Sequence, residues 1–301
     1  MKRFAFSTLL LFLLSGLSAQ IRIATYQYAD NDRIANIEPF AKHLKTVYGL
    51  DTRVKSYPTV HAFIDAIRNN EADVALINTF GYFLLQVADK PYPMRPLLTL
   101  AIREDAKDNY KTAFLSSTKS TITALEDVKK SAADTRLALV AKGSTSGNML
   151  PRLALSYAGI KDAEQSFAKV MYAGTHARAI DAVLNNEADL ATMGLTEYQR
   201  YLERDSANAS KLRLVWVSPE IPLGPVLFNN KLSKQDIETL SRAFLELNEK
   251  DPESLNAIKA GWSEAKQATK YITITDSFYN PFRKVLGNQK DLERILRQFA
   301  E

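Results

Sequence analysis

The sequence predicts an α/β protein built from two similar lobes, and three observations support this fold class. Residues 64–75 (IDAIRNNEADVA) return as residues 180–191 (IDAVLNNEADLA), at an offset of 180 − 64 = 116 residues. Strand-like and helix-like patterns alternate along the chain, which favours mostly parallel sheets with helices on both faces. The length of 301 residues suits two domains or one large one. Two facing lobes leave a cleft between them, where small ligands commonly bind.

The first nineteen residues have the pattern of a secretory signal peptide. Two basic residues provide the positive start, residues 4–17 form an apolar run, and Ser18 and Ala19 are small enough for cleavage. A membrane anchor is the alternative, but this run is short for crossing about 30 Å of hydrocarbon. We therefore expect export to the periplasm and removal of residues 1–19.

Composition excludes several kinds of site. The chain has no cysteine, so it can form neither disulfides nor thiolate metal sites. Its net charge of +5 is too small to indicate a nucleic-acid partner. The three histidines lack the spacing of metal ligands, so we expect no metal ion and no cofactor. A packed core must stabilise the exported chain, and a chain of this length can form one.

The elements of the first lobe follow in order from their apolar patterns. Residues 21–26 alternate apolar and polar side chains, as a strand does. Residues 34–48 have apolar side chains at helical spacing, and Gly49 follows where a helix C-cap belongs. A second strand, a helix and a short buried strand are then expected at residues 52–57, 63–70 and 74–77.

The second lobe repeats this plan between two crossovers, which together form a two-strand hinge. We assign residues 20–105 and 222–301 to lobe 1 and residues 106–221 to lobe 2. Three prolines between residues 219 and 225 interrupt regular structure at the return crossover. Strands are expected at residues 97–102, 112–115, 136–140, 167–171, 190–193 and 212–217, and helices at residues 149–158, 177–185, 235–249 and 289–299.

A hydroxyl-rich turn is the main candidate for a binding site. Ser144, Thr145 and Ser146 lie between Gly143 and Gly147, after a predicted strand and before a predicted helix. Free backbone N–H groups and the positive end of the helix dipole meet there, and the hydroxyls add donors. Both glycines would let the backbone approach a ligand closely. N-capping alone would explain one hydroxyl, whereas three of them favour oxyanion binding.

Two catalytic motifs are absent from this turn. It has no P-loop lysine, and Thr145 takes the central position that serine takes in a G-x-S-x-G elbow. We therefore assign no catalytic residue.

Further side chains are expected to line the cleft. His176 begins a predicted helix after a strand, so it can donate to a bound anion, and an ordinary capping histidine is the alternative. Tyr82 and Tyr198 are equivalent in the two halves, and a phenol there can reach a ligand. Core packing is the alternative, and it is favoured for Tyr198. Tyr26 ends the first strand and can line lobe 1's side of the cleft.

These residues resemble the phosphonate-, phosphate- and phosphite-type substrate-binding proteins of ABC importers. The resemblance rests on the turn of Ser144, Thr145, Ser146 and Gly147 together with the downstream His176, and it extends over nearly the whole chain after residue 19. It implies a two-lobed, type II periplasmic binding-protein fold. It also implies that the hydroxyls and helix N–H groups hold the phosphonate, with His176 and Tyr82 as further contacts.

The chain departs from the family pattern at two positions. Val60 stands where the family often has a tyrosine before the first repeat helix. Gly224 stands where members that capture an aminoalkyl phosphonate commonly have an acidic residue. The loss of that acid argues against a cationic ligand tail, although Glu197 could still hold one.

The sequence therefore predicts an exported, monomeric solute-binding protein that captures a small oxyanion and delivers it to a membrane ABC permease. Contacts from both lobes exist only in the closed form, so the ligand would shift the population toward closure. A ligand-sensing partner of a membrane sensor kinase is the first alternative. A hydrolase that uses Ser144 or Ser146 with His176 is the second, and it lacks an identifiable acid partner and oxyanion hole.

Overall fold

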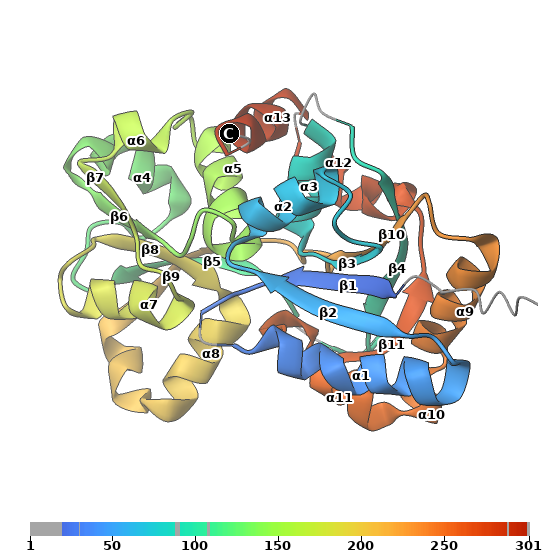
Figure 1. Cartoon of the computed structure of the whole chain (residues 1–301). Coiled ribbons are helices and arrows are strands. Elements are labelled where there is room, and N and C mark those ends of the chain that lie inside the picture. The colour runs from blue at the N-terminus through green and yellow to red at the C-terminus, as the bar shows by residue number, and fades with distance from the viewer. Residues whose placement is uncertain (1–19, 30, 88–90, 107–108, 288, 300–301) are drawn as a thin grey trace, which may run out of the picture.

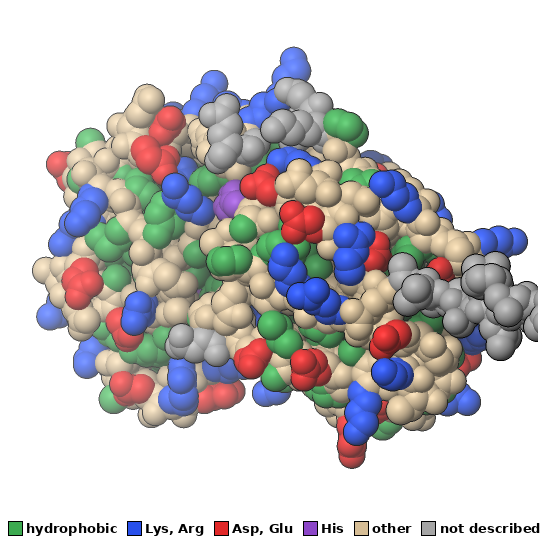
Figure 2. All heavy atoms as spheres, in the orientation of Figure 1, with side chains coloured by type: hydrophobic (Ala, Val, Ile, Leu, Met, Phe, Trp, Pro, Cys, Tyr) green, Lys and Arg blue, Asp and Glu red, His purple; other side chains and the backbone are tan. Residues whose placement is uncertain are grey.

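The computed structural model describes residues 20–29, 31–87, 91–106, 109–287 and 289–299. The predicted signal peptide, residues 1–19, lies outside these ranges. Two sheets form the centres of two lobes, and helices cover both (Figure 1). In the ranges that are described, no helix is long and apolar enough to cross a membrane. Charged side chains of both signs are interspersed over the face in Figure 2.

Lobe 1 is built on a six-stranded sheet in the order β11-β4-β10-β3-β1-β2. β1 runs parallel to β2 and β3, whereas β10 runs antiparallel to β3 and β4, and β11 antiparallel to β4. The elements of lobe 1 are β1 (Ile21–Tyr26), α1 (Arg33–Tyr48), β2 (Thr52–Tyr57), α2 (Val60–Arg68), β3 (Val74–Leu76), α3 (Thr79–Val87), β4 (Met94–Ile102), β10 (Pro225–Asn229), α9 (Lys234–Leu245), α10 (Leu247–Lys250), α11 (Pro252–Ala260), η4 (Ser263–Ala265), β11 (Ala268–Thr273), η5 (Asp276–Tyr279), α12 (Asn280–Val285) and α13 (Gln289–Arg297).

Lobe 2 is built on a five-stranded sheet in the order β7-β6-β8-β5-β9, in which β6 runs parallel to β7 and β8. β5 runs antiparallel to β8 and β9. Each sheet is therefore mixed, because the strand that enters each lobe after a crossover, β5 or β10, runs against its neighbours. The elements of lobe 2 are β5 (Thr112–Ser117), α4 (Leu125–Ser131), η1 (Ala132–Asp134), β6 (Arg136–Leu139), η2 (Thr145–Met149), α5 (Leu150–Tyr157), α6 (Ala163–Ser166), β7 (Lys169–Tyr172), α7 (His176–Leu184), β8 (Leu190–Gly194), α8 (Leu195–Arg204), η3 (Ser206–Lys211) and β9 (Leu212–Val217).

The repeated sequence segment forms a joint between a helix and the sheet. In lobe 1, the chain leaves α2 through Asn70, whose φ of 59° is left-handed. Asp73 then accepts hydrogen bonds from Arg22 Nε and Nη2 of β1 at 2.8 and 2.7 Å, and from the Arg22 backbone N–H at 2.8 Å. Arg22 Nη1 donates to the Asn70 carbonyl at 2.8 Å, so one side chain ties the turn to the strand.

Lobe 2 repeats this joint bond for bond. Arg136 Nε and Nη2 donate to Asp189 at 2.9 and 2.8 Å, and Arg136 Nη1 donates to the Asn186 carbonyl at 2.8 Å. Asn186 has a φ of 58°, which asparagine tolerates better than most residues. The repeated Asn-Asn-Glu-Ala-Asp motif therefore encodes architecture, since both joints lie at the sheets and neither takes part in the cavity described below.

The hydrophobic core crosses from one lobe to the other. A cluster in lobe 1 includes three residues of lobe 2: Met149 at the end of η2, and Leu150 and Leu153 at the start of α5. Two further clusters cover the two faces of lobe 2's sheet. The start of α5 is therefore packed against lobe 1 as well as against its own sheet.

We predict that Asp189→Asn lowers the free energy of unfolding by about 1–2 kcal/mol, because it weakens two charge-assisted hydrogen bonds that are partly exposed. Arg136 holds the pKa of Asp189 below its usual range, so this contribution is present above the unfolded carboxyl's pKa and is lost as the pH falls below it. Urea unfolding measures the change. Asp134→Asn, at an exposed carboxyl, is the control, and equal stability of the two variants would contradict the role of the joint.

Candidate ligand-binding site

The hydroxyl-rich turn begins a longer helix than the sequence predicts. One π-helical turn, η2 (Thr145–Met149), precedes α5 and continues into it. Ser144 is the N-cap, and its Oγ accepts a hydrogen bond from the Gly147 N–H at 3.0 Å. The N–H groups of a first helical turn have no partner within the helix. The turn therefore offers backbone N–H donors and three hydroxyls at the positive end of a helix dipole.

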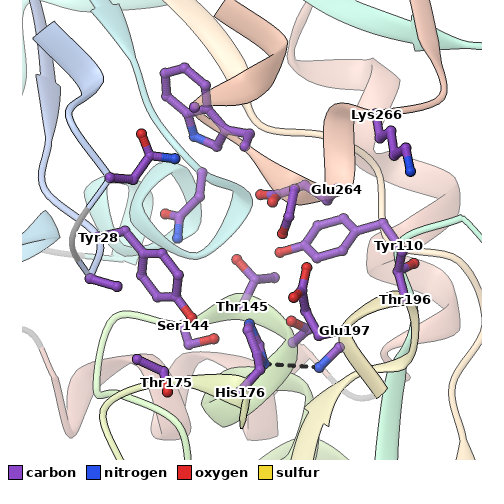
Figure 3. Close-up of a pocket in the computed structure, with 18 of the residues that line it drawn as sticks. Tyr28, Tyr110, Ser144, Thr145, Thr175, His176, Thr196, Glu197, Glu264 and Lys266 are labelled. Carbon is purple, nitrogen blue, oxygen red and sulfur yellow. Dashed lines mark hydrogen bonds between the residues drawn. The ribbon is translucent and has the colours of Figure 1, made fainter. Parts of the chain in front are cut away.

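A cavity of about 660 Å³ lies between the lobes and reaches this turn. Figure 3 shows side chains from both lobes converging on it. Of the eight residues that the sequence predicts as ligand contacts, six line it: Tyr26, Ser144, Thr145, Ser146, His176 and Glu197. Side chains that the sequence analysis did not select also line it, among them Arg33, Tyr110, Trp262 and Glu264.

The two lobes touch at the same turn. Asn78 Nδ2 of lobe 1 donates to the Gly143 carbonyl at 3.0 Å, and the Phe80 N–H donates to Thr145 Oγ1 at 3.1 Å. A Cβ on Gly143 would lie 2.1 Å from Val60 Cγ1 of α2. Gly143 is therefore needed for the approach of the lobes to each other. The oxygen of Thr145 is the acceptor in the contact with Phe80, and its side chain also contacts the buried Tyr110 hydroxyl.

Gly147 has a different role from the predicted one. It does not line the cavity, and a Cβ there would lie 2.3 Å from Val140 Cγ2. Its carbonyl accepts from the Val140 N–H at 3.0 Å and from Thr192 Oγ1 at 2.9 Å. Gly147 therefore lets the helix start pack tightly on lobe 2's sheet, which fixes the direction of the turn, and it does not approach a ligand.

His176 faces the cavity as a neutral hydrogen-bond donor. It is the first residue of α7, and its Nδ1 accepts from the Gly194 N–H at 3.1 Å, which is the dashed line in Figure 3. The hydrogen of the neutral ring is thereby assigned to Nε2. Burial lowers the pKa of His176 to about 4, against an opposing effect from Glu197. The ring is therefore neutral at neutral pH, and its Nε2–H can donate to an anion.

Two tyrosine hydroxyls complete this end of the cavity. Among the described residues, the buried hydroxyl of Tyr28 has no hydrogen-bond partner. Its ring lies 6.1 Å from the ring of His176, centroid to centroid, and Figure 3 shows its hydroxyl directed toward Ser144. Tyr110, at the crossover, has a left-handed φ of 29° that is unusual for a non-glycine residue. Tyr110 lines the cavity, and its buried hydroxyl contacts the side chains of Thr145 and Ser146.

Charged side chains of both signs line the rest of the cavity, namely Glu197 and Glu264 together with Arg33, Lys111, Arg200, Lys259 and Lys266. Arg33 lies between the rings of Tyr26 and Trp262, with its Cζ 4.4 and 4.3 Å from their centroids. Arg33 Nη1 donates to the Tyr26 carbonyl at 3.1 Å. Burial raises the pKa of Glu264, and the nearby Glu197 raises it further. Tyr26 therefore lines the cavity mainly as support for Arg33.

Glu197 is ion-paired at one side of the cavity. Its Oε1 accepts from Arg200 Nη1 at 2.9 Å, one helical turn away on α8. A cationic ligand group at Glu197 would therefore share the carboxylate with Arg200.

Tyr82 lies away from the cavity, contrary to the prediction. It is fully buried in the core of lobe 1, and its hydroxyl donates to Asp276 Oδ1 at 2.5 Å. Its ring packs on that of Tyr279, 5.1 Å away. The repeat aligns Tyr82 with Tyr198, but α3 begins beside the cavity and turns Tyr82 into the core. The core-packing alternative is the one observed.

Two α/β lobes with polar donors directed into one cavity between them are typical of solute-binding proteins. The family described as "ABC transporter, phosphonate, periplasmic substrate-binding protein" matches residues 23–279, and this chain belongs to that family. It is a family of non-enzymatic transport proteins, so the hydrolase alternative is set aside.

Individual relatives are distant in sequence and close in fold. The phosphonates-binding periplasmic protein of Escherichia coli K12 is 20% identical over 225 residues, which are 75% of this chain and 65%, less than two thirds, of that relative. A binding-protein component of an ABC phosphonate transporter from Pseudomonas aeruginosa is 19% identical, with a TM-score of 0.69 over 93% of this chain and 88% of that one. PhnD1 from Prochlorococcus marinus, whose structure was solved with methylphosphonate, is 16% identical, with a TM-score of 0.68 over 88% of this chain and 96% of that one. The two-lobed type II fold is thereby confirmed.

We predict that Gly143→Ala weakens phosphonate binding by about tenfold or more, because the new Cβ overlaps Val60 and disfavours the conformation in which the lobes touch at this turn. Val60→Ala in the same chain should restore much of the affinity by removing the overlapping methyl group. Calorimetric titration of both variants measures this effect. An unchanged affinity in Gly143→Ala, or no recovery in the double variant, would contradict the lobe-contact role of Gly143.

Proposed function

We propose that this protein captures a phosphonate- or phosphate-type anion in the cavity and delivers it to a membrane ABC permease. The proposal rests on one observation: hydrogen-bond donors of several kinds, from both lobes, line the same cavity. The hydroxyls of Ser144, Thr145 and Ser146 with their helix N–H groups, the Nε2–H of His176 and the unpartnered hydroxyl of Tyr28 all face the same cavity. An oxyanion with several acceptor oxygens satisfies such a set.

Closure follows from the origin of these donors. Tyr28 belongs to lobe 1, whereas the hydroxyl-rich turn and His176 belong to lobe 2. An anion that contacts both lobes stabilises the conformation in which they lie close together, so binding shifts the population toward it. A closed pair of lobes is then the form that a permease can distinguish from the empty carrier.

The carboxyl group of Glu264 supports a ligand that also carries a cationic nitrogen. Burial and the nearby Glu197 raise the pKa of Glu264, and a cationic group beside it would favour its ionised form. Gly224 cannot carry the acidic residue found in aminoalkyl-phosphonate binders, because its Cβ would lie 1.9 Å from the Ile77 carbonyl oxygen. Glu264, on η4, brings a carboxylate to the cavity from another segment. A zwitterionic phosphonate matches both ends of the cavity.

We predict that replacing Ser144, Thr145 and Ser146 together by alanine abolishes phosphonate binding, because the hydroxyl donors are removed. Ser146→Ala alone should weaken binding by about 10- to 100-fold, the effect of one hydrogen bond to a charged group. It is the cleaner variant, because Ser144 caps the helix and Thr145 contacts lobe 1. Calorimetry with 2-aminoethylphosphonate and methylphosphonate measures both effects. Ser206→Ala is the control, and full affinity in the triple variant would refute the site.

We predict that Glu264→Gln lowers affinity for 2-aminoethylphosphonate by about tenfold and leaves affinity for methylphosphonate equal or higher, because only the first ligand has a cation for the carboxylate. Thermal-shift titration with both ligands, phosphate and sulfate gives the order of preference, since a bound ligand raises the melting temperature. Equal losses for the two phosphonates would contradict the role of Glu264 in selecting a cationic group.

A further inference from the structure

The C-terminal helix α13 contacts both lobes. It packs against α3 of lobe 1 and α5 of lobe 2. Three of its side chains, Leu292, Ile295 and Leu296, are buried in the hydrophobic cluster that also contains the start of α5. In Figure 1, α13 lies between α5 and the pair α3 and α12, whereas α8 and α1, which contribute to the cavity, lie on the opposite side of the view. The helix therefore joins the lobes away from the ligand cavity.

Polar contacts hold α13 to the end of α5. Arg294 Nη2 donates to Ser156 Oγ at 2.9 Å, and Arg294 Nη1 donates to the carbonyl of Lys161. The hydroxyl of Tyr157 donates to the carbonyl of Leu286, just before α13. These bonds link residues more than 120 positions apart in sequence, so they are a connection between lobes that is independent of the two crossovers.

Phe299 extends this connection beyond the end of α13. Its ring lies 6.0 Å from the ring of Phe80 on α3 and 5.2 Å from the guanidinium carbon of Arg152 on α5. Arg152 is buried, and its Nε donates to Asn148 Oδ1 at 2.8 Å. Its Nη1 donates to Glu164 Oε2 at 2.8 Å. Asn148 lies in the π-helical turn that begins at Thr145, so two contacts connect Phe299 to that turn.

We propose that α13 and Phe299 form a strap that holds α5 of lobe 2 against α3 of lobe 1 and limits how far the cleft opens without ligand. The strap contacts are made in a conformation in which the lobes also touch at Gly143 and Thr145. Loss of the strap therefore lowers the population of that conformation, and the apparent Kd rises in proportion. The opening of the unliganded protein does not depend on which ligand the cavity binds.

The absence of native cysteines gives a direct test. Lys42→Cys on α1 and Glu203→Cys on α8 are both exposed and place one spin label on each lobe. Pulsed electron paramagnetic resonance then measures the distance between the two labels across the cleft. The proteins compared are the labelled parent, Phe299→Ala, Arg294→Ala and Gln298→Ala. Gln298 is an exposed neighbour of Phe299, so its variant is the control. We expect a longer and broader distance distribution in the first two variants without ligand, and a parent-like distribution in Gln298→Ala.

Ligand binding supplies the second readout. With saturating methylphosphonate, the distances of all variants should converge, and the Kd of the strap variants should rise by about three- to tenfold. Unliganded distances in both strap variants equal to those of Gln298→Ala, or shorter, would overturn the proposal. If Phe299→Ala does not fold, as judged by circular dichroism, the partly exposed Arg294→Ala decides the outcome. A ligand that fails to bind would count against the proposed function, whereas the unliganded distances would still test the strap.

Discussion

The contact between the hydroxyl-rich turn and lobe 1 is the constraint on which the rest of the structure depends. Gly143 and Thr145 of this turn touch lobe 1 at Val60, Asn78 and Phe80, and the turn must also leave donors free for an anion. Glycine at position 143 meets the first requirement, since any side chain would overlap Val60. The backbone N–H groups at the start of the helix, with the hydroxyls beside them, meet the second. Gly147 packs on Val140 and fixes the turn, so that both requirements can be met at once.

Electrostatics give the cavity two unlike ends. Burial keeps His176 neutral. The Gly194 N–H donates to its Nδ1, so the ring hydrogen is on Nε2, on the side of the hydroxyl-rich turn. Arg33 supplies a permanent positive charge to the opposite wall, but its place between two aromatic rings confines it there. Burial and the nearby Glu197 raise the pKa of Glu264, whereas Arg33 lowers it, so the charge of Glu264 depends on the group that lies beside it. The hydroxyl-rich end therefore offers neutral donors, whereas the rest of the lining holds charged side chains of both signs, Glu264, Arg33 and Lys266 among them.

The sequence predicts the parts of this structure that depend on local pattern. Apolar periodicity locates the strands and helices of the repeat, and the clustered hydroxyls locate the anion-binding turn. Tyr82 was wrongly predicted because a repeat aligns positions along the chain, whereas the rotation of α3 decides which side chain meets the cavity. Glu264 and Trp262 could not be found this way, since they lie more than 100 residues from the turn in a segment without a motif. Tyr110 carries no pattern either, because its placement follows from a strained crossover.

The duplicated joints have a consequence for how such a carrier can change. Positions 60 and 176 begin equivalent helices, each capped by a threonine, yet one holds a valine and the other a histidine. The arginine–aspartate clamps that anchor these helices are the same in both lobes and lie outside the cavity. The first residue of each helix can therefore differ while the clamp beneath it stays the same, since His176 lines the cavity and Val60 is buried where lobe 1 meets Gly143. One duplicated frame thus supplies a ligand-facing side chain in one lobe and a side chain that seats the partner lobe in the other.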